Sequence, residues 1–315
     1  MVAIVTGGAG FIGSHLVDAL VGRGEEVIVI DNLSAGNRRN IAGHIESGAV
    51  RFVQKDLLSD GWQDSFSGIA RVYHIAADPD VRASASNPEE VFRQNVTATM
   101  RVLEAMRKYD VRELVFTSTS TVYGEATVIP TPEDYTPMEP ISVYGGSKLA
   151  CEAMISAYAR TYGMTVWVFR FANIIGERSN HGVIWDFIHK LRKNSHELEI
   201  LGDGKQIKSY FSIGACVDAV LYAIAHSGAP FNCFNIGSDD WIDVTALAHI
   251  VIEEMGLSGV SFRYTGGDRG WVGDVPRMQL SVHRLKALGW KPATNSAESV
   301  RQAARELIRE TGGRA

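Results

Sequence analysis

The feature that most constrains the fold is a glycine-rich turn near the N-terminus, Thr6-Gly7-Gly8-Ala9-Gly10-Phe11-Ile12-Gly13. It follows a short β-branched run and opens an amphipathic segment. Glycines without a Cβ let the backbone turn tightly and approach a pyrophosphate, which then binds the free N–H groups at the helix N-terminus. The pattern therefore predicts a dinucleotide-binding unit. The contacts predicted within the turn are Gly7, Gly10, Phe11, Ile12 and Gly13.

An acidic residue follows this turn at the spacing that a dinucleotide site requires. Asp31 ends the second β-branched run, eighteen positions beyond Gly13. A carboxylate at this place accepts both adenosine-ribose hydroxyls and repels the 2′-phosphate of NADP. We therefore expect NAD as the cofactor. Arg38 and Arg39 lie nearby in the sequence and leave NADP open as an alternative.

Short apolar runs alternate with longer amphipathic segments along most of the chain. Most of the runs are continuously apolar, which is typical of strands buried on both faces of a parallel sheet. The predicted strands are Val2–Thr6, Val27–Asp31, Val50–Gln54, Val72–Ile75, Leu114–Ser118, Val166–Phe171 and Phe234–Ile236. The predicted helices are Gly10–Gly22, Pro88–Lys108, Tyr144–Tyr162, Val183–Lys193, Ala215–Ala225, Val244–Met255 and Ala297–Arg309. This alternation predicts an α/β fold of the Rossmann type, a doubly wound parallel sheet.

The strand–helix rhythm loosens after Asn173 and predicts a second, smaller α/β domain. We assign residues 1–172 to the dinucleotide-binding domain and expect 214–238 to return to it. Residues 173–213 and 239–315 form the predicted C-terminal substrate domain.

Composition excludes several classes of function. The chain has 31 basic and 36 acidic residues, a net charge of −5, and no run of five or six like charges, so we expect no nucleic-acid partner. Its three cysteines lack a C-x-x-C motif, and no histidine pair has H-x-x-x-H spacing, so no metal site is predicted. No signal peptide or membrane span is apparent, and we expect a cytoplasmic protein without a membrane partner.

The spacing G-x-x-G-x-x-G resembles the short-chain dehydrogenase/reductase superfamily, and a second motif strengthens the resemblance. Tyr144 and Lys148 lie four apart on a predicted helix, so they share one face. The ammonium group is expected to lower the pKa of the phenol, which lets tyrosine act as a general base. Thr119, at the end of a predicted strand, corresponds to the superfamily's Ser/Thr partner. The predicted catalytic residues are Thr119, Tyr144 and Lys148.

Further motifs resemble the extended branch of this superfamily, the nucleotide-sugar epimerase/dehydratase family. They include Lys55-Asp56-Leu57, His74-Ile75-Ala76-Ala77 and Arg170-Phe171-Ala172-Asn173. We interpret His74 itself as a core histidine. Besides the turn, Asp31, Tyr144 and Lys148, the cofactor contacts that the resemblance implies are Asn32, Ser34, Gly36, Asp56, Leu57, Ala76, Ala77, Asn95, Thr117 and Phe171.

The residues between Thr119 and Tyr123 separate the reactions within this family. Dehydratases and decarboxylases carry carboxylates there, whereas this chain has hydroxyls at Ser120 and Thr121. The hydroxyl pattern is similar to that of 4-epimerases acting on UDP-glucose and UDP-galactose, so a UDP-sugar substrate is implied. The substrate contacts implied by the resemblance are Val81, Thr119, Thr121, Asn173, Val183, Lys208, Tyr210, Arg269, Asp274 and Met278.

Several alternatives remain open at this stage. Lys208 stands where many relatives have arginine, which leaves the nucleotide and the sugar undecided. UDP-N-acetylhexosamine and UDP-glucuronate are alternative substrates, and a nucleotide-sugar dehydrogenase or reductase is an alternative enzyme. A non-catalytic NAD-sensing regulator is the alternative from another class. The resemblance also implies a homodimer through the helices near 88–108 and 144–162.

Overall fold

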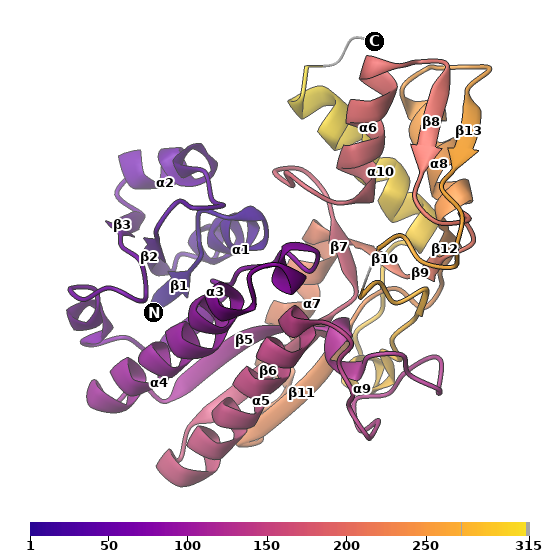
Figure 1. Ribbon diagram of the computed structural model, residues 1–315. Coiled ribbons are helices and arrows are strands. Elements are labelled where there is room, and N and C mark those ends of the chain that lie inside the picture. Colours follow the sequence, from indigo (N-terminus) through magenta and orange to yellow (C-terminus); the bar gives the residue numbers. More distant parts are fainter. Residues whose placement is uncertain (272, 313–315) are drawn as a thin grey trace.

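The computed structural model describes residues 1–271 and 273–312 and is built around a parallel sheet. Its seven strands are β1 (Val2–Thr6), β2 (Glu26–Asp31), β3 (Val50–Gln54), β4 (Arg71–His74), β5 (Glu113–Thr119), β6 (Thr165–Phe171) and β11 (Phe231–Ile236). They lie in the order β11-β6-β5-β4-β1-β2-β3 (Figure 1). The chain runs outward from β1 through β2 to β3 and then crosses to β4 on the other side of β1. The predicted doubly wound Rossmann-type sheet is confirmed.

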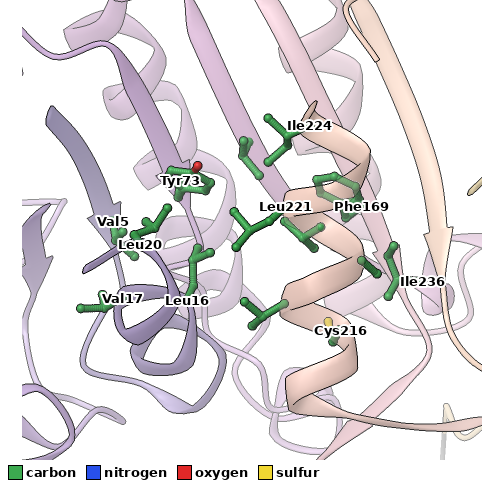
Figure 2. Packing of buried hydrophobic residues seen from close by; sticks show 14 of the residues in the cluster. Val5, Leu16, Val17, Leu20, Tyr73, Phe169, Cys216, Leu221, Ile224 and Ile236 are labelled. Atoms are coloured by element: carbon green, nitrogen blue, oxygen red, sulfur yellow. The ribbon is translucent and has the colours of Figure 1, made fainter. Parts of the chain in front are cut away.

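Helices cover both faces of this sheet. One face carries α1 (Phe11–Gly22) and α7 (Ile213–His226), which pack side by side in one apolar cluster (Figure 2). The other face carries α4 (Ala98–Lys108) and α5 (Val143–Tyr162). Neighbouring strand residues alternate between the two clusters, so Val5 packs with α1 while Ile4 packs on the opposite face. This double burial explains why the strands are continuously apolar.

The segment predicted as one helix over Pro88–Lys108 is interrupted. It consists of α3 (Pro88–Phe92), a π-helical turn η4 (Arg93–Thr97) and α4. A π turn leaves backbone groups available to other partners. Here the Asn95 carbonyl accepts hydrogen bonds from Thr99 Oγ1 at 2.6 Å and Cys151 Sγ at 3.4 Å. The interruption lies where side chains of α4 and α5 both bond to the Asn95 carbonyl.

A separate apolar cluster lies beside the carboxyl end of the sheet. It contains residues of α6 (Val183–Lys193), α8 (Val244–Glu254) and α10 (Ser296–Glu310), together with the parallel strands β8 (Glu197–Ile200) and β13 (Ser261–Tyr264) (Figure 1). Short strands connect this cluster to the main sheet: β7 (Asn173–Ile175), β9 (Ile207–Lys208), β10 (Tyr210–Ser212), β12 (Ile242–Asp243) and β14 (Arg277–Met278).

The remaining helices are short. They are α2 (Ala42–Glu46), α9 (His283–Ala287) and the single turns η1 (Arg38–Ile41), η2 (Gln63–Phe66), η3 (Ala83–Ala85) and η5 (Ser120–Tyr123). Among the described residues, no helix combines the length and apolar character needed to cross a membrane.

Candidate active site

The candidate site lies at the carboxyl ends of the central strands. Thr6, Asp31, His74 and Thr119 each end a strand, and the parallel pairing brings them to one edge of the sheet. The chain leaves β1 in one direction and β4 in the other, so the boundary between these two strands is the topological switch point of the sheet. Ligands of doubly wound sheets bind at such a switch point.

The glycine-rich turn lies at this switch point, against the residues that follow β4. Gly7 has φ +70°, and a Cβ on it would lie 2.7 Å from the Ala76 nitrogen. A Cβ on Gly13 would lie 2.1 Å from the Gly7 carbonyl oxygen. Gly10 begins α1 without a side-chain cap, and the first turn holds no acidic residue. The free N–H groups and the positive end of the helix dipole therefore suit an anion such as a pyrophosphate.

Asp31 lies beside this turn and is 7% exposed. Its Oδ2 accepts a hydrogen bond from Ala9 N at 3.0 Å, and its Oδ1 accepts one from Leu33 N at 2.7 Å. Burial raises the pKa of the carboxyl, while these two backbone bonds oppose the shift. Each oxygen retains a lone pair, so the group can still accept two hydroxyls.

The loops after β2 and β3 meet at the same edge. Asn32 Nδ2 donates to Asp56 Oδ2 at 3.0 Å, and Ser34 N donates to Asn32 Oδ1 at 2.9 Å. Gly36 packs against Ala9, where a Cβ would lie 2.9 Å from the carbonyl carbon. The structure thus brings these predicted cofactor residues together around the turn. Three more of them are buried in the adjoining core: Leu57, Thr117 and Phe171.

The three predicted catalytic residues come from two elements. Thr119 is the last residue of β5, and Tyr144 and Lys148 lie on the first turns of α5, which Ser142 caps by accepting a hydrogen bond from Gly145 N at 3.0 Å. The hydroxyl of Thr119 faces the Tyr144 phenol and lowers its pKa. Thr121 Oγ1 lies 3.2 Å from Thr119 Oγ1.

Burial dominates the electrostatics of this set. It raises the pKa of Tyr144 to about 12 and lowers that of Lys148 to about 8. The Lys148 ammonium lies 4.5 Å from the centroid of the Phe116 ring, and it is not among the groups that shift the phenol. The expected lowering of the Tyr144 pKa by this ammonium is therefore wrong for the protein alone. The main cause is burial, which removes the hydration of a phenolate and raises the pKa instead.

Asn95 contacts α5 from the π turn. Its Nδ2 donates to Ser147 Oγ at 2.9 Å and to the Asp78 carbonyl at 3.2 Å, while its Oδ1 accepts from Asp78 N at 2.7 Å. Ser147 Oγ in turn donates to the Tyr144 carbonyl at 2.7 Å. The side chain predicted as a cofactor contact thus joins the loop holding Ala76 and Ala77 to α5.

His74 is a core histidine, as interpreted from the sequence. Its Nδ1 lies 2.7 Å from Thr6 Oγ1, and its Nε2 lies 2.9 Å from Thr99 Oγ1. Burial lowers its pKa to about 3, with a smaller contribution from Lys148. The ring is therefore neutral and links β1 to the helix behind the site.

A second group of polar residues gathers on the short strands β9 and β10 and on the loop before β14. The Lys208 ammonium forms a salt bridge with Asp274, whose Oδ2 also accepts a hydrogen bond from Gly270 N at 3.0 Å. Arg269 pairs with Glu125 at 2.6 Å. The nearby Asp274 also contributes to the raised pKa of Tyr210, although burial is the main cause. Four predicted substrate residues are therefore neighbours, although they lie far apart in the sequence.

The other predicted substrate residues border this group. Met278 on β14 is the register partner of Lys208 on β9 and packs against a small cluster that contains Val122. Asn173 Nδ2 donates to the Ser209 carbonyl at 3.0 Å. Val183 begins α6.

Sequence reasoning missed two residues at this place. The Arg82 guanidinium carbon, next to Val81, lies 4.1 Å from the centroid of the Trp271 ring, and Lys208 Nζ lies 5.0 Å from the same centroid. No motif spacing signals this contact, because Arg82 and Trp271 are brought together by two loops.

Known proteins resemble this chain over nearly its whole length. A family model described as the NAD dependent epimerase/dehydratase family matches residues 3–237. A putative UDP-glucose 4-epimerase of Methanocaldococcus jannaschii is 36% identical over 306 residues, which cover 95% of this chain and 96% of that protein. The crystal structure of a UDP-galactose 4-epimerase is 45% identical, with a TM-score of 0.88 and coverage of 98% of this chain and 99% of the other. A UDP-glucose 4-epimerase of Thermus thermophilus in complex with NAD is 31% identical, with a TM-score of 0.87 over 100% of both chains.

Proposed function

Because this chain belongs to the NAD dependent epimerase/dehydratase family, we propose that it is a UDP-hexose 4-epimerase that interconverts UDP-glucose and UDP-galactose. The observation that carries this proposal is the hydroxyl-bearing segment beside Tyr144. Thr119 and Thr121 present hydroxyls 3.2 Å apart, and that of Thr119 lowers the pKa of the phenol. Epimerisation at C4 needs only one proton-accepting group at a hydroxyl, which this set provides.

The cofactor is NAD, and the described residues fit it. The uncapped start of α1 suits the pyrophosphate, the close approach at Gly7 and Gly13 leaves the backbone exposed there, and Asp31 suits the adenosine ribose. NAD supplies the acceptor for the C4 hydride and the donor for its return to the other face.

The chain's own residues manage the proton. Tyr144, as phenolate, takes the proton of the sugar 4-hydroxyl directly or through Thr119. It gives the proton back after the 4-keto sugar has rotated to present its other face. Since burial holds the phenol pKa near 12, a positive charge at the site is needed to stabilise the phenolate. Lys148 is the buried cation on the same face of α5.

A product assay tests this function. The protein is incubated with a panel of UDP-, dTDP- and acidic nucleotide sugars, and the products are identified by NMR. We expect conversion of UDP-glucose to UDP-galactose without net NADH. Net NADH would support a dehydrogenase instead, and bound NAD without any product would support a regulator.

The cofactor should be NAD rather than NADP, by about 10²-fold or 2.7 kcal/mol. A 2′-phosphate would meet the Asp31 carboxylate, and neither arginine nearby compensates. Arg38 lies over the Phe52 ring at 5.5 Å, and Arg39 lines a surface crevice with three glutamates. Fluorescence titration measures both affinities. Asp31→Asn should weaken NAD binding and move the ratio towards one, and equal affinities in the wild type would contradict the prediction.

Substrate breadth should depend on Met278. Methionine is unbranched and flexible, so it can move aside for an acetamido group at C2. We expect clear activity on UDP-glucose/galactose and weaker, measurable activity on the N-acetylated pair. Met278→Tyr should lower the second activity about tenfold more than the first, because added bulk penalises only the larger sugar. Met278→Leu is the matched control and should leave the ratio unchanged. An equal fall in both activities would show that Met278 does not discriminate between the two sugars.

A homodimer is a further prediction. Phe92, at the end of α3, is 54% exposed, and Tyr162, at the end of α5, is 37% exposed. Both lie on the helices that the family resemblance places at a dimer contact. Light scattering should give twice the chain mass of 34.4 kDa, and a monomer at micromolar concentration would contradict this prediction.

A further inference from the structure

A buried ion pair lies directly behind the candidate catalytic residues. Arg170 on β6 and Glu152 on α5 are 5% and 4% exposed. The guanidinium donates from Nε to Glu152 Oε1 at 3.0 Å and from Nη2 to Oε2 at 2.6 Å. The Ser118 hydroxyl also donates to Oε1. Buried ion pairs of this kind contribute little net stability compared with apolar packing, so their placement needs a reason.

The geometry links this pair to the catalytic set. Tyr144, Lys148 and Glu152 follow one another at intervals of four on α5, so they form one stripe on the helix face turned towards the sheet. Ser118 immediately precedes Thr119 on β5. The Glu152 carboxylate therefore joins the helix that carries the phenol and the ammonium to the strand end that carries the threonine.

We propose that Glu152 is a positioning residue for Lys148 and Tyr144. Its carboxylate fixes their helix face against β5 and β6 and places a negative charge behind the Lys148 ammonium. The part of this inference that concerns turnover rests on the proposed function, in which Lys148 and Tyr144 take part in catalysis. The part that concerns the charge state of Lys148 does not.

The surroundings of Lys148 support this role. The titratable groups around Lys148 come from several elements. Tyr144, Cys151 and Glu152 lie on α5, and His74 lies on β4. Arg170 of β6 lies beyond Glu152, and Asp78, in the loop after β4, raises the pKa of the Tyr144 phenol. His74 is neutral, and burial raises the pKa of the Cys151 thiol, so that group is neutral too. Cys151 and Glu152 both oppose the burial-induced lowering of the Lys148 pKa, and Glu152 is the carboxylate of the two.

Removing this carboxylate should lower the Lys148 pKa further. A lysine whose pKa falls loses its charge at a lower pH, so the protonated form needed for turnover disappears earlier as pH rises. For Glu152→Gln we expect the midpoint of Lys148 to fall by about one pH unit. The alkaline limb of the kcat profile should move by the same amount, while KM for the nucleotide sugar stays unchanged.

The experiment follows Lys148 directly in the NAD-loaded protein. Lysine is labelled with ¹³C, the Lys148 resonance is assigned by its loss in Lys148→Met, and its shift is followed by NMR against pH. Glu152→Asp retains the charge and should recover most of the wild-type midpoint. Ser118→Ala removes one hydrogen bond but no charge and should leave the midpoint in place.

Glu152→Gln leaves the Arg170 guanidinium without its buried partner, which is strongly destabilising. The double variant Glu152→Gln/Arg170→Met removes two opposite charges, whose effects on Lys148 partly cancel. Because Glu152 precedes Arg170 on the path to Lys148, the Lys148 midpoint should still fall, by less than in Glu152→Gln, if circular dichroism confirms folding. A wild-type midpoint in either folded variant would overturn the proposal. Since the titration needs no substrate, it decides this inference even if the wild type turns over no nucleotide sugar.

Discussion

Replacing Tyr144 with phenylalanine should lower turnover by about 10²–10⁴-fold and leave NAD bound. The substitution removes one oxygen, the group that takes the proton of the sugar hydroxyl, and keeps the ring that fills the site. Thr119 remains beside the ring, but an alcohol is a far weaker base than a phenolate. Initial rates of UDP-galactose formation measure the loss, and NAD titration shows that the cofactor site is intact.

A control separates the loss of this oxygen from damage to the helix. Tyr162, on the last turn of the same α5, is 37% exposed, so Tyr162→Phe should keep near wild-type turnover. Turnover of Tyr144→Phe within a few-fold of the wild type would show that another group accepts the proton.

Replacing Gly13 with alanine should reduce NAD affinity by about 10²-fold, equivalent to about 2.7 kcal/mol, because the turn must open to relieve the contact. The new Cβ would lie 2.1 Å from the Gly7 carbonyl oxygen and 2.8 Å from the Gly8 Cα. Both are backbone atoms, which cannot move without displacing the loop that approaches the pyrophosphate. Titration with NAD measures this change, and thermal unfolding should show a lower melting temperature.

Gly22, on the same helix, gives the matched control. A Cβ there meets no atom within 4 Å, and alanine favours a helix more than glycine does, by about 1 kcal/mol. Gly22→Ala should therefore bind NAD normally and unfold at the same or a higher temperature. If Gly13→Ala also bound NAD normally, the turn would not be the cofactor site.

The central sheet was predictable because its signals are local. Each strand is a short apolar run between breakers, and the glycine turn, Asp31 and the Tyr144/Lys148 pair are recognised by fixed spacing. The glycine turn and Asp31 converge because parallel strands present their carboxyl ends at one edge, and Tyr144 and Lys148 join them from the first turns of α5. The family, the fold and NAD are confirmed by the sheet order and by the similar proteins.

What the sequence did not predict depends on distant contacts. Lys208 and Asp274 are 66 positions apart, and nothing in their spacing distinguishes a buried ion pair from two solvated charges. The bond from Ser118 to Glu152 spans 34 positions. The two-residue strands β9, β12 and β14 are too short to show an alternating pattern, and the π turn at Asn95 depends on side chains from α4 and α5.

The strand order also has a consequence for synthesis on the ribosome. Two elements that complete the sheet are translated late. β11 pairs with β6, and α7 covers the apolar side of the sheet beside α1. Both are made only after the chain has passed through β7, α6 and β8 to β10. In a nascent chain that has just completed β6, the edge of β6 that will pair with β11 is therefore unpaired. The apolar surface that α7 will cover is exposed as well. Such edges pair readily with other chains. Protection of the growing chain, by a chaperone or by spacing between ribosomes, matters most until Ile236 has emerged.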